Sequence, residues 1–325
     1  MNIHNNFGHS YYASRDVGVL VLTRTYSSSF GGRWKIDIGN KVKLIDFLYN
    51  RILDAGIVDQ SKIIISTTQE QDDYELFKYA QIQNYNIFRG PCEKIVTRVI
   101  VSADKIKAKH LVLIYGNYPL IALEKAKELL DTYLQSDYDF AYNELSCGLV
   151  YGCGVEIINV EKLRHVGMTL ANEDIEMFPS YYFKENPEEF KIFCAHSLLC
   201  DPNFSLALDS HTDQFIIREI IRLSKSLNYE DIFKTIEDNK QLLDHHKKKN
   251  TTGEVGLNKI MLFPHKISEI RNKENFLFPI SVELSLTNRC NLNCIWCSDS
   301  KLREHTGMDN DLSKETLFNL ITDLR

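Results

Sequence analysis

Residues 17–240 predict a doubly wound α/β fold with a mostly parallel sheet. Short runs rich in β-branched residues alternate with longer amphipathic segments along this part of the chain. Such alternation is typical of crossover helices that cover both faces of a parallel sheet. The composition agrees, because 44% hydrophobic and 25% charged residues describe an ordinary globular chain. We therefore expect most of the chain to fold.

The individual elements follow from the spacing of apolar residues. In chain order, we expect strands at Val17 to Thr23, Lys62 to Thr67, Asn86 to Phe88, His110 to Tyr115 and Phe140 to Asn143. We expect helices at Lys43 to Ala55, Asp72 to Gln83, Glu93 to Ala108 and Leu123 to Gln135. A further helix is expected to begin in DSHTDQ, with Ser210 or Thr212 as its N-cap. Ligands of such sheets bind beyond the carboxyl ends of the strands, so the segments 24–33, 67–71, 89–92 and 116–119 are the candidate site.

The length of 325 residues favours more than one domain, since a single core rarely grows beyond ~250 to 300 residues. A polar, basic and glycine-containing stretch, DHHKKKNTTGEVG, cannot bury a face and is interpreted as part of a linker. The alternating segment Ile280 to Leu286 predicts a strand that opens a second unit. The expected organisation is an extension at 1–16, an α/β domain at 17–240, a linker at 241–279 and a second unit at 280–325.

Charge and hydropathy exclude several classes of partner. The formal net charge of −6 provides no bulk positive field for a nucleic acid or an anionic membrane. No leader is apparent, and the apolar run Val17 to Leu22 is far shorter than the ~18 residues of a spanning helix. We expect a cytoplasmic protein, in which disulfides are disfavoured. Cys147, Cys153, Cys194 and Cys200 are accordingly interpreted as buried free thiols rather than zinc ligands.

The most informative local feature is CNLNCIWC, in which Cys290, Cys294 and Cys297 have the spacing CxxxCxxC. Three thiolates on one short loop can hold a 4Fe-4S cluster while one iron has no protein ligand. The alternative is a structural zinc ion, with His305 as a fourth ligand. Zinc motifs more often pair two CxxC halves, so the iron-sulfur interpretation is favoured.

The longer string VELSLTNRCNLNCIWC, with Trp296 before the last cysteine, resembles the radical S-adenosylmethionine superfamily. The resemblance implies that the open iron binds S-adenosylmethionine, and that a reducing partner such as a flavodoxin or ferredoxin supplies electrons. The stretch after Cys290 holds the cluster loop and one expected helix, Ser313 to Leu324, which is the first βα unit of an incomplete barrel. We therefore expect the N-terminal portion of a longer enzyme.

Residues 17 to about 225 resemble the sugar-activating cytidylyltransferases of the spore-coat polysaccharide type and relatives that make CMP-linked acidic sugars. The motifs are LVLTRTYSSSFGGR, GNKVKLIDFLYNRI, FRGPCEKIVTR, YGNYPLI, GCGVEIINVEKL and LALDSHTDQF. The resemblance implies a Rossmann-like nucleotidyltransferase fold, a homodimer, and a site for a cytidine nucleotide with Mg²⁺. The residues that would form this site are Arg24, Gly31, Gly32, Arg33, Arg89, Arg98, Asn117 and Asp209. Physically, a glycine-containing loop lets backbone N–H groups approach phosphates, and arginines add charge-assisted hydrogen bonds.

Two departures from that family pattern bear on activity. Asn117 stands where the family carries an acidic Mg²⁺ ligand, and Ser29 replaces the loop arginine, while Asp209 matches the second metal aspartate. A neutral amide is a weaker ligand for a hard cation than a carboxylate, so we expect little or no pyrophosphate release from CTP. The leading interpretation is a radical S-adenosylmethionine enzyme of surface polysaccharide or nucleotide-sugar metabolism, whose nucleotidyltransferase-like domain binds a sugar or nucleotide-sugar. The alternatives are an active cytidylyltransferase and a noncatalytic binding module with structural zinc.

Overall fold

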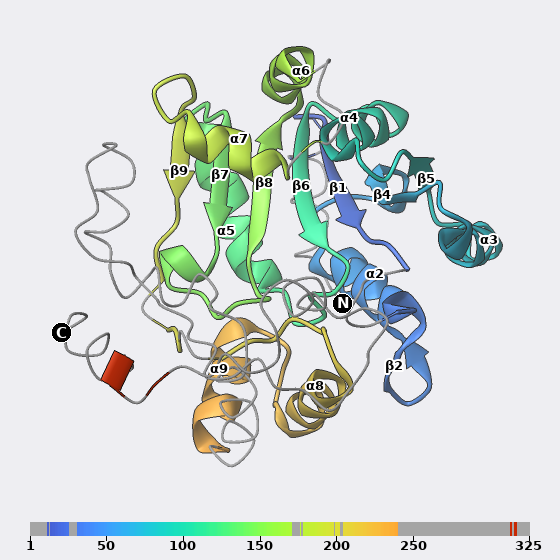
Figure 1. Cartoon of the computed structure of the whole chain (residues 1–325), viewed down its shortest axis with the longest axis vertical. Helices are drawn as coiled ribbons and strands as arrows, with labels where there is room; N and C mark the ends of the chain where they lie inside the picture. Colours follow the sequence, from blue (N-terminus) through green and yellow to red (C-terminus); the bar gives the residue numbers. More distant parts are fainter. Residues whose placement is uncertain are drawn as a thin grey trace. The chain divides into compact units, whose positions relative to one another are not determined.

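Figure 1 shows the computed structural model of the chain, which describes residues 12, 14–25, 31–170, 176, 178–197, 199–201, 204–239, 313 and 315–316. The chain divides into two units, Met1–Thr252 and Gly253–Arg325, and the elements below belong to the first. The strands are β1 (Val17–Leu22), β2 (Asp37–Gly39), β3 (Val42–Lys43), β4 (Ile63–Thr68), β5 (Ile87–Gly90), β6 (His110–Tyr115), β7 (Phe140–Asn143), β8 (Val155–Asn159) and β9 (Ile192–Cys194). The α-helices are α2 (Leu44–Ala55), α3 (Tyr74–Ile82), α4 (Ile95–Lys105), α5 (Leu123–Gln135), α6 (Val160–Thr169), α7 (Pro179–Glu185), α8 (His211–Leu223) and α9 (Tyr229–Asp238).

The centre of the first unit is a seven-stranded sheet with the order β5-β4-β1-β6-β8-β7-β9. β1 pairs in parallel with both β4 and β6, and β4 pairs in parallel with β5. β8 runs antiparallel to both of its neighbours, β6 and β7. The sheet is therefore mostly parallel, with one reversed strand, as expected of a Rossmann-like nucleotidyltransferase fold.

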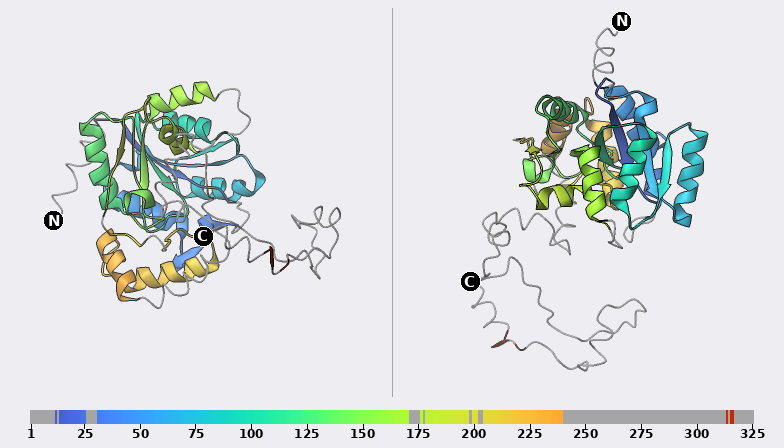
Figure 2. Two further views of the ribbon diagram at one scale, coloured as in Figure 1. Left: turned by 60° about the vertical axis from the view of Figure 1, so that its left-hand side comes forward. Right: turned by 90° about the horizontal axis from the view of Figure 1, so that it is seen from above.

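Alternation along β1 explains why both faces of the sheet are covered. Val17, Val19 and Val21 belong to a core formed with α2, α3 and α5, whereas Leu20 and Leu22 belong to a core formed with α4, α6 and α7. Successive side chains of a strand point to opposite faces, so a continuous apolar run needs helices on both sides. Figure 2 shows helices on the two faces of the sheet.

A third core lies beyond the carboxyl ends of the parallel strands, where α8 and α9 are seen in Figure 1. Arg51 ties α2 to this region, because its guanidinium donates to the carbonyl oxygens of Pro119, Ile121 and Leu227 at 2.5, 2.9 and 2.9 Å. Partial burial lowers the pKa of Arg51. The three carbonyl acceptors offset the cost of withdrawing this cation from water and fix the loop that follows β6.

The predicted elements agree closely with the observed ones up to residue 143. The expected bounds of β6, α5 and β7 match the observed bounds, and those of the other predicted helices and strands differ by at most three residues at either end. Ser210 is the N-cap of α8, because its side chain accepts from the amide of Asp213, so the predicted cap is confirmed. No strand was predicted at β2 or β3, and no element at β8, β9, α6, α7 or α9.

The expected linker at 241–279 and the strand Ile280 to Leu286 lie outside the described residues, as does nearly all of the helix predicted at Ser313 to Leu324. The predicted barrel unit therefore remains a prediction. Among the residues that the structure describes, no helix combines the length and the apolar content that crossing a membrane would require.

Candidate active site

Four strand ends meet at one edge of the sheet and bring distant segments of the sequence together. The carboxyl ends of β1, β4, β5 and β6 are adjacent because these strands are parallel neighbours. Gly116, directly after β6, allows a close approach to the end of β1, since an added Cβ would lie 2.5 Å from the Cβ of Thr23. The side chain of the next residue, Asn117, is thereby held at this edge.

Asn117, Asp209 and Arg33 form one polar cluster at this edge. The side-chain amide of Asn117 donates to Oδ1 of Asp209 at 3.1 Å, and the guanidinium of Arg33 pairs with the same oxygen at 3.0 Å. The backbone supports the cluster, because the amide of Leu208 donates to the carbonyl oxygen of Asn117 at 2.8 Å. The side chain of Asp209 is 44% exposed, so its carboxylate is accessible to a ligand.

The donor chemistry of this cluster fits Mg²⁺ if a nucleotide completes the coordination. Among the described residues, no group of three or more His, Cys, Asp and Glu side chains could hold a metal ion. Mg²⁺, however, is commonly bound by one or two carboxylates together with substrate phosphates and water. The hydrogen bond from Asn117 and the ion pair with Arg33 both involve Oδ1 of Asp209. Asp209, with the amide oxygen of Asn117, would hold the ion beside a triphosphate.

Besides Arg33, Arg98 is a second cationic residue of the predicted nucleotide site. It lies on α4 and is only 4% exposed, and among the described residues its Nε has no hydrogen-bond partner. One terminal nitrogen donates to the carbonyl oxygen of Pro91 at 3.3 Å. Burial lowers the pKa of Arg98, the nearby charges of Cys92 and Asp73 raise it, and nearby Arg24 lowers it. A buried guanidinium with an unsatisfied donor is suited to an anionic oxygen.

The structure gives three further residues of the predicted nucleotide site, Gly31, Gly32 and Arg89, different surroundings. Gly32 has a φ of 69°, which favours glycine, and it precedes the short 3-10 helix Arg33–Lys35 and so orients Arg33. Gly31 lies in open surroundings, because no atom of the described residues is within 4 Å of the place that a Cβ would take there. The guanidinium of Arg89 donates to the carbonyl oxygens of Thr68, Gln69 and Glu70. Arg89 therefore fixes the turn after β4, and these donors are engaged within the fold.

Two buried carboxylates near this edge were missed by the sequence reasoning. Asp73 is 1% exposed and accepts hydrogen bonds from Thr25 and Thr68. Glu156, on β8, is 5% exposed, and the hydroxyl of Tyr115 lies 3.3 Å from both of its oxygens. Burial raises the pKa of Glu156 to about 7. The sequence signal for Glu156 was a single acidic residue inside the apolar run Val155–Asn159.

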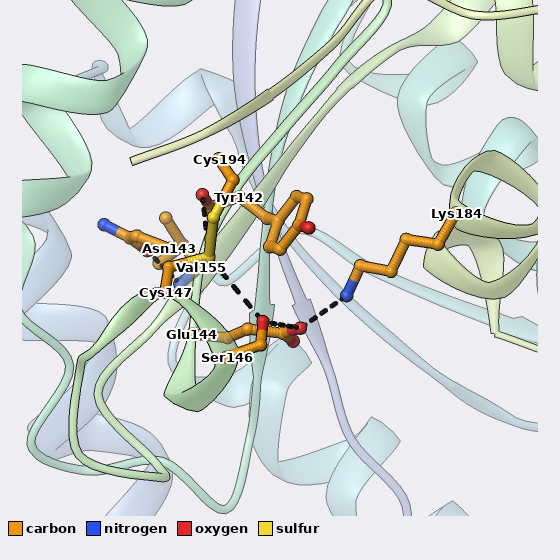
Figure 3. Close-up of a disulfide and its surroundings, with 8 residues drawn as sticks. All are labelled: Tyr142, Asn143, Glu144, Ser146, Cys147, Val155, Lys184 and Cys194. Carbon is orange, nitrogen blue, oxygen red and sulfur yellow. Dashed lines mark hydrogen bonds and ion pairs between the residues drawn. A yellow bond between two sulfur atoms is a disulfide. The ribbon is translucent and has the colours of Figure 1, made fainter. Parts of the chain in front are cut away.

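A disulfide between Cys147 and Cys194 corrects the expectation that both are free thiols (Figure 3). β9 pairs with β7, which places Cys194 opposite Tyr142, and the short helix Leu145–Cys147 returns Cys147 to the same place. The two Cα atoms are 6.3 Å apart, within the usual range for a disulfide. The expectation of free thiols rested on apolar neighbours and on a reducing cytosol, and strand β9, which brings Cys194 to Cys147, was not predicted. Cys153 and Cys200 are free, and Cys153 is fully buried.

The neighbourhood of the disulfide also holds an ion pair. The ammonium of Lys184 lies 2.7 Å from Oε1 of Glu144, and the hydroxyl of Ser146 donates to the same oxygen at 2.8 Å (Figure 3). The ion pair connects α7 to the loop that carries Cys147.

The cysteine cluster of Cys290, Cys294 and Cys297 lies outside the described residues, as does His305. The predicted 4Fe-4S cluster, the S-adenosylmethionine site and the zinc alternative are therefore not tested by the structure.

Comparison with known proteins assigns the first unit. A family model described as cytidylyltransferase matches residues 18–255. The spore coat polysaccharide biosynthesis protein SpsF of Bacillus subtilis (strain 168) is 23% identical over 221 residues, which is 63% of this chain and 86% of the relative. The uncharacterized protein MJ1063 of Methanocaldococcus jannaschii is 21% identical over 174 residues, 54% of this chain and 69% of the relative. A solved cytidylyltransferase from Leptospira borgpetersenii serovar Hardjo-bovis (strain JB197) has the same fold, with a TM-score of 0.62 at 22% identity over 70% of this chain and 96% of that chain.

Proposed function

This chain belongs to the cytidylyltransferase family, and from that premise we propose that residues 17–240 transfer a cytidylyl group from CTP to a sugar. A hydroxyl oxygen of the sugar would form a bond to the α-phosphorus of CTP and release its proton to water, the bond from this phosphorus to the oxygen that bridges the α- and β-phosphates would break, and pyrophosphate would leave. The observation that carries the proposal is the cluster of Asn117, Asp209 and Arg33 at the carboxyl edge of the sheet.

Each residue of the site has a distinct task in this proposal. Mg²⁺, when bound, would neutralise charge on the triphosphate. Asp209 would hold the ion, and Asn117 would orient Asp209 through the hydrogen bond of 3.1 Å. Arg98 would place a buried positive charge beside the phosphates, where low solvent access strengthens the interaction. The chain's own side chains thus favour the charge that develops on the leaving pyrophosphate.

Asn117 favours a second function, in which the domain binds CTP or a CMP-sugar without turnover. The sequence alone led to that expectation because an amide replaces a carboxylate. The geometry supports turnover instead, since Asn117 is hydrogen-bonded to the retained carboxylate and one carboxylate with phosphates can suffice for Mg²⁺.

The test is pyrophosphate release from CTP by the full chain, with Mg²⁺ and a panel of neutral and acidic sugars. We expect metal-dependent release that is greater with CTP than with ATP, GTP or UTP. We also expect Asn117→Asp to lower the Mg²⁺ concentration needed for half-maximal rate by about tenfold, because a carboxylate is the stronger ligand for this ion. Calorimetric binding of CTP or CMP-sugars without release under any condition would contradict the transferase proposal and leave the binding function.

The cysteine segment at 280–325 lies beyond the family match, which ends at residue 255. We propose that Cys290, Cys294 and Cys297 hold an iron-sulfur cluster, supported by their CxxxCxxC spacing. Anaerobic reconstitution of the full chain with iron and sulfide is expected to yield a brown protein with bound iron and sulfide. Replacing any one of the three cysteines by alanine should abolish the cluster, with Cys92→Ala as the matched control. Stoichiometric zinc without iron after anaerobic purification would contradict this prediction.

A further inference from the structure

Asp73 is a buried carboxylate to which the proposed reaction assigns no task. It lies between β4 and α3 and is 1% exposed. One oxygen, Oδ1, accepts from the backbone amide of Thr25. The other, Oδ2, accepts from both the amide and the hydroxyl of Thr68, the amide at 3.0 Å. Three donors from two strand ends thus converge on one side chain.

Thr25, which follows β1, is also bonded to Gly32, which precedes Arg33. The carbonyl oxygen of Thr25 accepts from the amide of Gly32 at 2.8 Å. Thr68 is the last residue of β4, and the backbone of Thr23 is bonded to Ser66 of the same strand at 3.0 Å. Asp73 therefore connects Thr25, and through it Gly32, to the end of β4.

The hydrogen bonds to Asp73 offset the cost of burying its carboxylate. An uncompensated buried carboxylate is costly, and burial by itself raises the pKa of Asp73. Hydrogen bonds from Thr25 and Thr68 more than compensate and lower its pKa below the ordinary value. Asp73 is therefore ionised at neutral pH, and its hydrogen bonds are charge-assisted. Its negative charge also acts on the guanidinium of Arg98.

We propose that Asp73 is a positioning residue, which holds Thr25 and Gly32 at the end of β4 so that Arg33 remains on Asp209 while CTP binds. The proposal rests on the proposed function, because it assumes that Arg33 and Asp209 lie beside a bound nucleotide. Asp73 itself would not touch the substrate. Removing Asp73 would leave Gly32 bonded to Thr25 but would release both residues from β4. The position of Arg33, which follows Gly32, would then no longer be fixed.

The test compares Asp73→Ala and Asp73→Asn with the matched control Asp72→Ala, since Asp72 is the exposed neighbour. For Asp73→Ala, we expect the KM for CTP to rise by about 10- to 100-fold, with a smaller fall in kcat, because displacement of about 1 Å has effects of this size. Asp73→Asn keeps one carbonyl oxygen as an acceptor and is expected to lie between the wild type and the alanine variant. Kinetics are measured well below the melting temperature of each variant.

Hydrogen exchange without nucleotide provides a readout that does not depend on activity. The backbone amide of Thr25, which donates to Asp73, is expected to exchange at least tenfold faster in the Asp73 variants than in the wild type or Asp72→Ala, whereas the amide of Gly32 keeps its acceptor on Thr25 and serves as an internal reference. A lower melting temperature with unchanged exchange and unchanged KM would overturn the positioning role. If the wild type neither binds nor turns over CTP, the proposed function fails. Unchanged exchange of the Thr25 amide in Asp73→Asn would then overturn the positioning role of Asp73 as well. If Asp73→Ala does not fold, Asp73→Asn decides the outcome.

Discussion

Replacing Asp209 by alanine is expected to lower kcat/KM for pyrophosphate release from CTP by roughly 100- to 1,000-fold, the usual effect of removing one preorganised group that stabilises the transition state. Asp209 is the one carboxylate in the cluster with Asn117 and Arg33 among the described residues. Its loss would remove the anionic ligand for Mg²⁺ and leave Arg33 without its ion-pair partner there. The measurement is steady-state turnover over a range of Mg²⁺ concentrations.

Two comparisons make this result interpretable. Asp209→Asn keeps the size of the side chain and is expected to lose activity while its melting temperature stays near that of the wild type, since Asp209 is 44% exposed. Thr212→Ala, at an exposed position in the first turn of α8, is expected to keep full activity. Wild-type turnover and an unchanged Mg²⁺ requirement in both Asp209 variants would show that the ion is held elsewhere.

The second large effect is on stability and concerns Glu156. Its side chain is 5% exposed, and the nearby ammonium of Lys184 is already 2.7 Å from Glu144. Burial raises the pKa of Glu156 from 4.5 to about 7. The folded state therefore binds more protons than the unfolded state between these pH values, and its stability falls as the pH rises through this window. At about 1.4 kcal/mol for each pKa unit, the loss is about 3 kcal/mol.

Glu156→Gln is therefore expected to be more stable than the wild type by up to about 3 kcal/mol at pH 8 and similar to it at pH 4, because glutamine carries no charge to bury. Urea unfolding followed by circular dichroism from pH 4 to 8 measures the difference. Glu188→Gln, at an exposed position, should follow the pH dependence of the wild type. A glutamine variant that is less stable than the wild type at pH 8 would mean that Glu156 is ionised and paired in the folded state.

The sequence by itself determined the first half of the sheet and its helices. β6, α5 and β7 were predicted to the residue, because strand and helix periods are local properties of an apolar pattern. The same pattern placed Asn117 directly after a strand, where ligands of such sheets bind. The motif containing Asp209 identified a second polar segment, and residue type limited the helix cap to Ser210 or Thr212, of which the structure has Ser210.

Only the tertiary structure decided which of these groups meet. Asn117 and Asp209 are 92 residues apart, and their contact depends on the third core beneath the strand ends. The reversed strand β8, the disulfide to β9 and the anchoring of Thr25 by Asp73 likewise join positions remote in sequence. A local period specifies the type of an element and its buried face, whereas partners across the sheet are selected by packing of the whole core. Single polar residues such as Asp73 and Glu156 have no period, so their burial and their roles emerge only when distant segments enclose them.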